Sequence, residues 1–282
     1  MPPFPEIYSG AHGLDLLAAI DAAGKLVFTS AEAMTAGRER ALTPRQIGHV
    51  LQRLVAAGWL RRIKQGLYAV TGKLPGSVAA HDFAIATAIH VPSVLSHATA
   101  LNLHGLSEQV PRIITCTTTA KIVTPAMRRG GSGTKHRASE WDVEGLRIRF
   151  VTVIPSRFFG IEDVWVDTRT RVPVTDRERT VLDLFVDPRG RSGLGEAFGV
   201  LEEHASRLDV PRLVSYAVRL GIASVGRRLG WALETRGVAS HVLAPLLELQ
   251  VRGTTLLDPR GPRRGTLIGR WQLRDNLPNA TR

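Results

Sequence analysis

The sequence predicts an α+β protein that begins with a small helical module and ends with a run of helices. Two observations favour this class. Short β-type runs fall at residues 26–29 and 59–70 and recur between residues 113 and 174, whereas from residue 194 onward apolar side chains recur at helical spacing. We therefore expect a mixed sheet with helices in the middle of the chain and a mainly helical C-terminal part.

The length of 282 residues favours two domains over one. The stretch Thr71-Gly72-Lys73-Leu74-Pro75-Gly76-Ser77 has the composition of a linker, so we expect domains at residues 1–75 and 76–282. A softer break near residue 188 would divide the second domain into a mixed part, 76–187, and a helical part, 188–282. Apolar residues make up 44% and charged residues 22%, which excludes disordered, collagen-like and disulfide-scaffold classes.

Positive charge gathers at the two ends of the chain. The sequence holds 37 Lys and Arg against 25 Asp and Glu, a net charge of +12, which favours a polyanionic partner. Residues 1–75 contribute +4 and residues 188–282 contribute +7, while the middle is nearly neutral. Because 32 of the 37 bases are Arg, a skew that a GC-rich genome also produces, net charge alone is weak support for nucleic-acid binding.

The sequence predicts a cytoplasmic protein. Cys116 is the single cysteine, so no internal disulfide forms. Residues 1–10 lack the basic and apolar regions of a signal peptide. The longest stretch without Asp, Glu, Lys or Arg, residues 83–107, is interrupted by three histidines and by Pro92, which a membrane core would not tolerate. We interpret it as two core helices around a turn at Pro92.

The first 75 residues predict a series of short elements. Residues 14–23 have helical spacing, and residues 26–29 form a short strand. Ser30 can cap a second helix, which Gly37 breaks. Thr43-Pro44-Arg45-Gln46 then starts a third helix, with the threonine as N-cap, the proline in the first turn and the glutamine closing a capping box.

The third helix, residues 43–57, has two distinct faces. Its apolar stripe is formed by Ile47, Val50, Leu51, Leu54 and Val55. The opposite face carries Arg45, His49, Gln52 and Arg53, since residues four, seven and eight apart stack on one side. Two β-type runs follow, 59–64 and 67–70, and the Gln65-Gly66 pair between them suits a two-residue hairpin. Three helices, a strand and a basic hairpin in this order are typical of a winged helix-turn-helix.

This module predicts an interface with double-stranded DNA. The third helix of such a fold enters the major groove, and the hairpin contacts the backbone. Arg45, Gln46 and His49 are the base-reading candidates because they lie in the first turns of the helix. The rest of the predicted interface is the N-cap Thr43 and the phosphate contacts Arg53, Arg61, Arg62 and Lys64. Alternatively, the basic face is only solvated and the module packs against other proteins, but the basic hairpin favours DNA.

The larger part of the chain shows no convincing catalytic constellation. Residues 128–137 form a basic, Gly-rich loop without the Gly-Lys-Ser/Thr ending of a phosphate-binding loop, so a solvated loop is favoured over phosphate or partner contact. His97 and His104 are seven residues apart, too far along a helix to bind one metal. Glu162 and Asp163 lack the acid-x-Lys partner of a nuclease site. We expect no catalytic residue, metal or cofactor.

Other polar residues have structural explanations. Thr175-Asp176-Arg177-Glu178 reads as a second capping box, and Asp183 lies four residues after Arg179, at pairing distance on a helix. The basic tail, residues 252–274, is open to two interpretations. It is either an arm that packs back onto the body through Leu267, Ile268 and Trp271, or a basic surface for an acidic protein or RNA. The sequence favours neither.

Three segments carry a resemblance to a known family. The first is residues 28–70, with the ending Leu54-Val55-Ala56-Ala57-Gly58-Trp59-Leu60-Arg61-Arg62-Ile63-Lys64-Gln65-Gly66-Leu67-Tyr68. The second is Leu95-Ser96-His97-Ala98-Thr99-Ala100-Leu101-Asn102-Leu103-His104-Gly105-Leu106-Ser107, followed by Val110-Pro111. The third is Val174-Thr175-Asp176-Arg177-Glu178-Arg179-Thr180-Val181-Leu182-Asp183-Leu184, with the ending Leu257-Asp258-Pro259 and Arg270-Trp271-Gln272-Leu273. In these segments the chain resembles the AbiEi family of antitoxins from bacterial toxin–antitoxin operons.

The resemblance implies a winged helix that represses the protein's own operon, with its recognition helix at residues 43–57 and its wing at residues 61–66. It also implies that residues 76–282 form an antitoxin domain, which neutralises a nucleotidyltransferase-like toxin encoded next door. In relatives described as type IV the antitoxin need not form a stable complex with the toxin, so direct contact stays open. The family supplies no catalytic residues to transfer.

Two other functions stay open at this point. The first is a stand-alone winged-helix transcriptional regulator whose larger domain binds a ligand or dimerises. The second, ranked below it, is an enzyme that acts on nucleic acid or on the toxin through Asp163 or Asp183.

Overall fold

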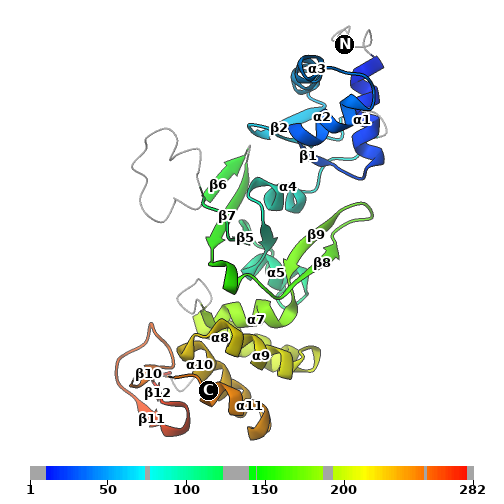
Figure 1. Ribbon diagram of the computed structural model, residues 1–282. Helices are drawn as coiled ribbons and strands as arrows, with labels where there is room; N and C mark the ends of the chain where they lie inside the picture. The colour runs from blue at the N-terminus through cyan, green and yellow to red at the C-terminus, as the bar shows by residue number, and fades with distance from the viewer. Residues whose placement is uncertain are drawn as a thin grey trace. The chain divides into compact units, whose positions relative to one another are not determined.

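The computed structural model describes residues 11–73, 77–122, 140–143, 145–186, 193–250 and 253–277. Two compact units make up the chain. The first comprises Met1–Ser93, Ala120–Phe150 and Asp163–Pro173, and the second comprises Val94–Thr119, Val151–Glu162 and Val174–Arg282. The elements are labelled in Figure 1. No helix among the described residues is long and apolar enough to cross a membrane.

The chain begins with the elements expected for its first 75 residues (Figure 1). They are α1 (Ala11–Ala22), β1 (Val27–Thr29), α2 (Ser30–Arg38), α3 (Pro44–Ala56), β2 (Leu60–Lys64) and β3 (Leu67–Val70). The strands form an antiparallel sheet in the order β1-β3-β2. The apolar stripe of α3 supplies Ile47, Leu51 and Leu54 to the core, where they pack with residues from α1, α2 and the sheet. The helices and the hairpin are therefore confirmed, including the third-helix capping box.

The interpretation of Gly37 as a helix breaker is wrong. Helix α2 runs through it to Arg38, and its N-cap is Thr29, which forms a capping box with Glu32, rather than Ser30. A Cβ on Gly37 would lie 2.6 Å from Ile47, so the glycine allows α2 and α3 to approach closely. Its function is packing between helices.

The middle of the chain contains a mixed sheet. Its elements are α4 (Asp82–Ile89), β4 (Ser93–Leu95), α5 (His97–Leu103), β5 (Ile114–Thr118), β6 (Glu140–Val143), β7 (Leu146–Thr152), β8 (Ile161–Trp165) and β9 (Arg171–Thr175). The strands form a six-stranded sheet in the order β6-β7-β5-β4-β9-β8. The expectation of two helices around a turn at Pro92 is therefore incomplete, because the buried strand β4 follows the turn and pairs in parallel with β9.

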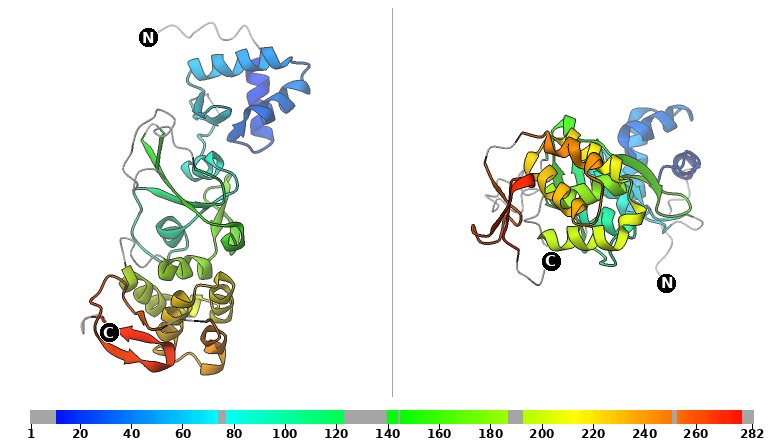
Figure 2. Two further views of the ribbon diagram at one scale, coloured as in Figure 1. Left: turned by 60° about the vertical axis from the view of Figure 1, so that its left-hand side comes forward. Right: turned by 90° about the horizontal axis from the view of Figure 1, so that it is seen from below.

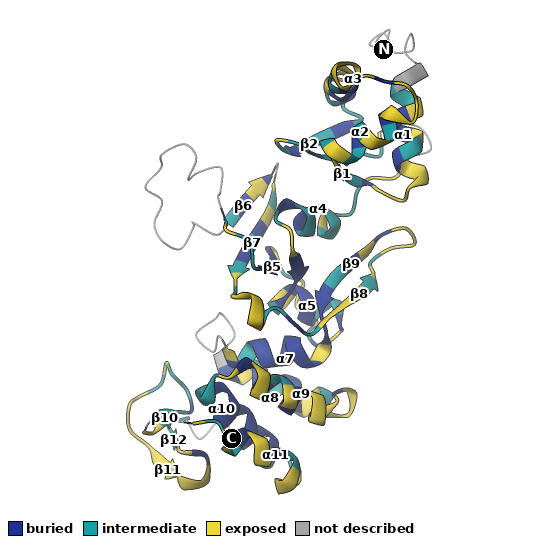
Figure 3. Ribbon diagram, viewed as in Figure 1, coloured by how far each residue is buried: buried dark blue, intermediate teal, exposed yellow. Residues whose placement is uncertain are grey.

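The second unit ends in helices and a small sheet. These are α7 (Arg177–Val186), α8 (Gly193–His204), α9 (Val210–Leu220), α10 (Ala223–Glu234), α11 (Ser240–Leu247), β10 (Thr255–Leu256), β11 (Thr266–Ile268) and β12 (Leu273–Asp275). Helix α7 is buried along most of its length, as Figure 3 shows. The helical C-terminal part is confirmed, and so is the α+β class.

The C-terminal tail packs onto these helices, which answers one of the questions that the sequence left open. Trp271 is fully buried, and its ring lies so close to α10 that a Cβ on Gly230 would meet it at 2.1 Å. Ile268 packs against the same core, whereas Leu267 is exposed. Figure 2 shows the sheet of β10, β11 and β12 beside the helices in a second view. The arm interpretation holds for Trp271 and Ile268 but not for Leu267.

The predicted domain boundary at residue 75 stays a prediction. The compact first unit continues beyond it through residue 93. On either side of the expected linker, Thr71 and Ala79 form an antiparallel bridge, and the Ala80 amide donates to the Val70 carbonyl at 2.8 Å.

Candidate nucleic-acid interface

Helix α3 starts from a fully formed capping box. The Thr43 hydroxyl accepts a hydrogen bond from the Gln46 amide at 3.3 Å, and the Gln46 side-chain oxygen accepts from the Thr43 amide and hydroxyl, both at 2.8 Å. The carbonyl oxygen of the Gln46 side chain is thus already in use. Bidentate recognition of adenine needs both the oxygen and the nitrogen of the amide. With the box intact, Gln46 has only its amide nitrogen left to offer a base.

One face of α3 is exposed and basic. Arg45, His49 and Arg53 are exposed, whereas Ile47, Leu51 and Leu54 on the opposite face are buried. Among the described residues, Arg45 and Arg53 form no ion pair with a carboxylate. Their charges are therefore available to a partner, as a groove-binding helix requires.

The β2–β3 hairpin presents a second basic surface. Its turn passes through Gly66, whose φ of +76° is a conformation that a side chain would strain. The strand register shifts between Arg62 and Lys64, and Ile63 points into the core. Arg62 is exposed and Arg61 is half-buried. The hairpin therefore exposes Arg62 most fully.

Lys64 occupies a different environment from the other predicted phosphate contacts. Its ammonium donates a hydrogen bond to the carbonyl oxygen of Ile89, at the end of α4, and the side chain is half-buried. This bond joins the hairpin to the helix that follows it. Because the Lys64 ammonium already donates to this carbonyl, we expect its contact with a phosphate to contribute less binding free energy than that of a fully hydrated side chain.

Two arginines that the sequence analysis did not include lie between α2 and α3. Arg38 ends α2 and Arg40 follows it, and both are exposed. Arg40 donates to the Ala36 carbonyl at 2.8 Å and lies 3.7 Å from the Glu39 carboxylate, so part of its charge is compensated. Their position in the turn between the two helices of the motif was the signal that could have identified them.

His90, directly after α4, lies in an aromatic setting. Its ring makes edge-to-face contacts with Trp141 at 5.4 Å and Phe150 at 4.7 Å between ring centroids, and its Nε2 is buried without a partner among the described residues. Burial, followed by the positive charge of Lys64, lowers the pKa of His90. The neutral ring is therefore the form that this environment favours.

Asp163 and Asp183, the residues of the enzyme alternative, belong to different units. Asp163 is exposed on β8. Asp183 is buried, and its Oδ1 accepts from Arg179 Nε at 2.9 Å, as their spacing predicted. Arg179 also donates to the carbonyls of Arg157 and Phe159. The predicted capping box at residues 175–178 needs correction, since Asp176 caps α7 by accepting from the Arg179 amide.

Neighbouring polar groups complete this buried network. Glu178 accepts from the Asp209 amide at 2.9 Å, and Asp176 also accepts from the Tyr216 hydroxyl at 2.8 Å. Burial and the hydrogen bond to Asp176 raise the pKa of Tyr216 to about 12. His104 is buried and bonds through Nε2 to the Thr175 carbonyl, whereas His97 contacts the Ser96 hydroxyl. These bonds tie the start of α7 to α9, and the end of α5 to β9.

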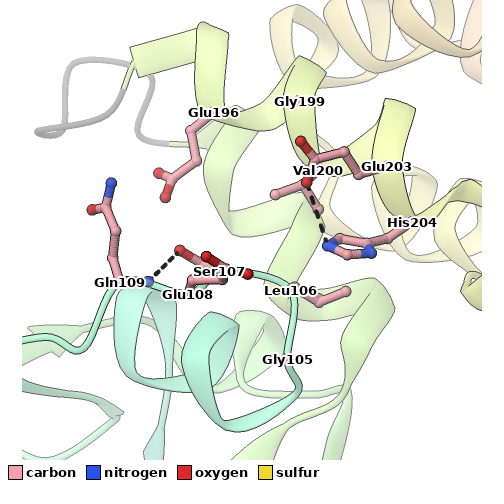
Figure 4. A pocket seen from close by; sticks show the side chains of 10 residues that line it. All are labelled: Gly105, Leu106, Ser107, Glu108, Gln109, Glu196, Gly199, Val200, Glu203 and His204. Atoms are coloured by element: carbon pink, nitrogen blue, oxygen red, sulfur yellow. Dashed lines mark hydrogen bonds and ion pairs between the residues drawn. The ribbon is translucent and has the colours of Figure 1, made fainter.

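An acidic hollow of about 880 Å³ lies in the second unit between α8 and the segment after α5. Glu196 and Gln109 face each other across it, and Glu203 lies beside His204 at 3.9 Å (Figure 4). The other interaction drawn there is a hydrogen bond from the Gln109 backbone amide to the Ser107 hydroxyl. Among the residues drawn, no hydrogen bond joins the Ser107 hydroxyl to His204 or to a carboxylate, as a nucleophile and its base would require.

Metal ligands do not cluster in the described part of the chain, where no group of three His, Cys, Asp or Glu side chains could hold an ion. Cys116, the single cysteine of the sequence, is buried in β5. The basic loop predicted at residues 128–137 lies outside the described residues.

Comparison with known proteins supports the assignment of the N-terminal module. Residues 15–71 match the family model described as "Transcriptional regulator, AbiEi antitoxin", which confirms the resemblance for the first of the three segments. The fold is similar to the crystal structure of the RV2827C protein from Mycobacterium tuberculosis, with a TM-score of 0.58, 15% identity and coverage of 95% of this chain and 92% of that chain. The curated proteins contain no match to the chain.

Proposed function

We propose, from the match of residues 15–71 to AbiEi antitoxin regulators, that this protein is a cytoplasmic DNA-binding antitoxin. It represses its own operon and neutralises a nucleotidyltransferase-like toxin encoded beside it. The observation that carries the DNA-binding half is the exposed basic face of α3, where Arg45 and Arg53 have no carboxylate partner among the described residues. The match supports the antitoxin half.

Different residues of the first unit contact the bases and the phosphates of the DNA. Helix α3 enters the major groove, with Arg45 and His49 in its first turns reading base edges. Gln46 is restricted to donating through its amide nitrogen because its oxygen closes the cap. Arg53 and Arg62 bind phosphates, with the β2–β3 hairpin acting as the wing.

DNA binding is tested with the intergenic segment upstream of the gene. A labelled duplex of this segment and a scrambled duplex of equal length and composition are titrated with the protein by fluorescence anisotropy at several salt concentrations. We expect tighter binding to the upstream duplex, with a difference that Arg45→Ala reduces. Equal affinities for the two duplexes would contradict operator recognition.

Neutralisation is best tested with the full chain. Removing residues 1–75 would break the Lys64–Ile89 hydrogen bond and the 2.6 Å pair between Arg169 and Asp21, so a truncated protein exposes surfaces that are normally covered. The double variant Arg45→Glu, Arg53→Glu changes only exposed side chains. It separates DNA binding from toxin neutralisation.

The double variant is co-expressed with the neighbouring gene, and growth and promoter activity are followed together. We expect growth arrest by the neighbour to be relieved by both the wild-type chain and the variant, while only the wild type represses the promoter. Robust toxicity that neither protein relieves would contradict the antitoxin function and favour a stand-alone regulator. Rescue by the wild type alone would contradict the separation of the two functions.

A further inference from the structure

A basic pocket of about 450 Å³ lies between the C-terminal sheet and α10 in the second unit. Arg228 from α10, Arg263 from the loop before β11, and Arg274 from β12 line it. The side chains of Leu256 and Pro259 give it an apolar part. Binding pockets for small molecules have volumes of roughly 300 to 1,000 Å³, so the size fits a small organic ligand.

Two of the three guanidinium groups are held in place by backbone carbonyls. Arg228 is only 7% exposed, and its Nε and Nη2 donate to the carbonyls of Leu256 and Leu257 at 3.0 to 3.1 Å. Arg274 donates through Nη1 to the Gly265 carbonyl at 3.1 Å. These bonds orient the guanidinium groups, and the accepting carbonyl oxygens carry only a partial charge. The pocket is therefore preorganised for an anion.

The wall of the pocket is fixed by a buried asparagine. Asn276 accepts from the Asp258 amide at 2.8 Å and donates to the carbonyls of Asp258 and Pro262 at 2.8 and 2.9 Å. Gly261 lies against it, since a Cβ there would be 2.7 Å from the Asn276 amide nitrogen. These hydrogen bonds therefore fix the loop that carries Pro259 and Arg263 to the end of β12.

Among the described residues that line the pocket there are three arginines and no carboxylate. Arg263 is exposed and has no hydrogen-bond or ion-pair partner among the described residues. Arg270, by contrast, forms an ion pair, with its guanidinium 3.0 Å from the Glu234 carboxylate. Asp258 and Asp275 are close in sequence to these arginines but are not among the described lining residues. Their carboxylates accept hydrogen bonds from the backbone amides of Arg260 and Leu277.

We propose that this pocket binds the phosphate groups of a nucleotide. Arginine forks match phosphate oxygens in geometry and charge, and three of them converge here from three elements. A bare phosphate ion would leave most of the volume empty, whereas a nucleoside phosphate also places a sugar or base against Leu256 and Pro259. The same phosphate chemistry is present in a nucleic-acid strand, so the test separates the two sources.

The test uses the full-length protein and isothermal titration calorimetry with ATP as the nucleotide probe. Pyrophosphate and a single-stranded 12-nucleotide RNA without terminal phosphates are titrated in parallel. The variant is Arg263→Gln, which removes one lining charge from an exposed, unpaired position. Its matched control is Arg264→Gln, because Arg264 is also exposed and adjacent but does not line the pocket.

We expect ATP to bind, pyrophosphate to compete with it, and Arg263→Gln to weaken ATP binding about tenfold, the usual effect of losing a charged hydrogen bond. Arg264→Gln should change it less than twofold. Equal loss in the two variants would overturn the proposal in favour of a diffuse basic surface. Binding of the RNA but not of ATP would overturn the proposal of a nucleotide ligand and favour a nucleic-acid strand. If none of the three probes binds, the pocket is not a phosphate-binding site.

Discussion

Arginine serves opposite purposes in the N-terminal module and in the helices of the second unit. In the module, Arg45 and Arg53 are exposed along one face of α3. In the second unit, Arg179 and Arg227 are at most 5% exposed and donate hydrogen bonds to carbonyls of neighbouring segments, and Arg179 also pairs with Asp183. The same residue type therefore forms a candidate surface for polyanions in one region and joins elements of the core in the other.

This difference shows why net charge overstates the area available to nucleic acid. Residues 188–282 have the larger excess of basic residues, +7 against +4 for residues 1–75. Yet in that region Arg227 and Arg236 bond to backbone carbonyls, and Arg270 pairs with Glu234. The exposure of an arginine side chain and its ion-pair partners therefore decide whether it serves the structure or can bind a polyanion.

The largest expected effect is from breaking the buried arginine network. Arg179→Ala leaves the Asp183 carboxylate buried without its 2.9 Å partner. Removing one member of a buried ion pair costs about 3 to 5 kcal/mol of unfolding free energy. Urea unfolding followed by circular dichroism measures it.

The control for this change is Arg177→Ala, at an exposed position two residues earlier in the same helix. It should shift the unfolding free energy by less than about 0.5 kcal/mol. Similar losses in both variants would show that burial does not distinguish these arginines.

The second effect is on DNA binding without loss of stability. Arg45→Ala removes an exposed side chain, so its unfolding curve should match that of the wild type. Loss of a base contact costs about 1 to 3 kcal/mol of binding free energy. Anisotropy with the upstream duplex measures this, with Arg177→Ala as the charge-matched control. An unchanged affinity would remove Arg45 from the interface.

A smaller effect separates the two basic side chains of the hairpin. Arg62→Ala should lower the slope of log affinity against log salt by about one, because one phosphate contact is lost. Lys64→Ala should lower it less, since the Lys64 ammonium donates to the Ile89 carbonyl. Equal decreases in slope would show that this bond opens on DNA.

The smallest expected effect is a pH dependence in the first unit. Burial and Lys64 lower the pKa of His90 below its ordinary value of 6.5, so the stability contributed by the neutral ring is complete above that pH and is lost as the pH falls below it. Thermal unfolding between pH 7.5 and pH 5 should show a decline that His90→Phe diminishes, since phenylalanine keeps the aromatic packing. His49→Gln, at an exposed position, should leave the decline unchanged. A wild-type decline that His90→Phe does not alter would assign it to other groups.

Local sequence signals determined much of this structure. The capping box of Thr43 and Gln46, the apolar stripe of α3 and the glycine of the hairpin turn each depend on residues within a few positions of one another. Such interactions form wherever the segment folds, so spacing alone predicts them. The same is true of the Arg179–Asp183 pair within α7.

Tertiary structure decided what each of these residues can do. Gly37 looked like a helix breaker, but the distance to Ile47 makes it a packing position, and no local pattern reveals the neighbouring helix. Lys64 stays a predicted phosphate contact, but its hydrogen bond to the Ile89 carbonyl depends on the packing of α4 against the hairpin. The pocket of Arg228, Arg263 and Arg274 unites residues from three separate segments. Short-range hydrogen bonds and helical periodicity can therefore be predicted from the sequence. Burial, charge pairing and pocket formation depend on which distant segments pack together.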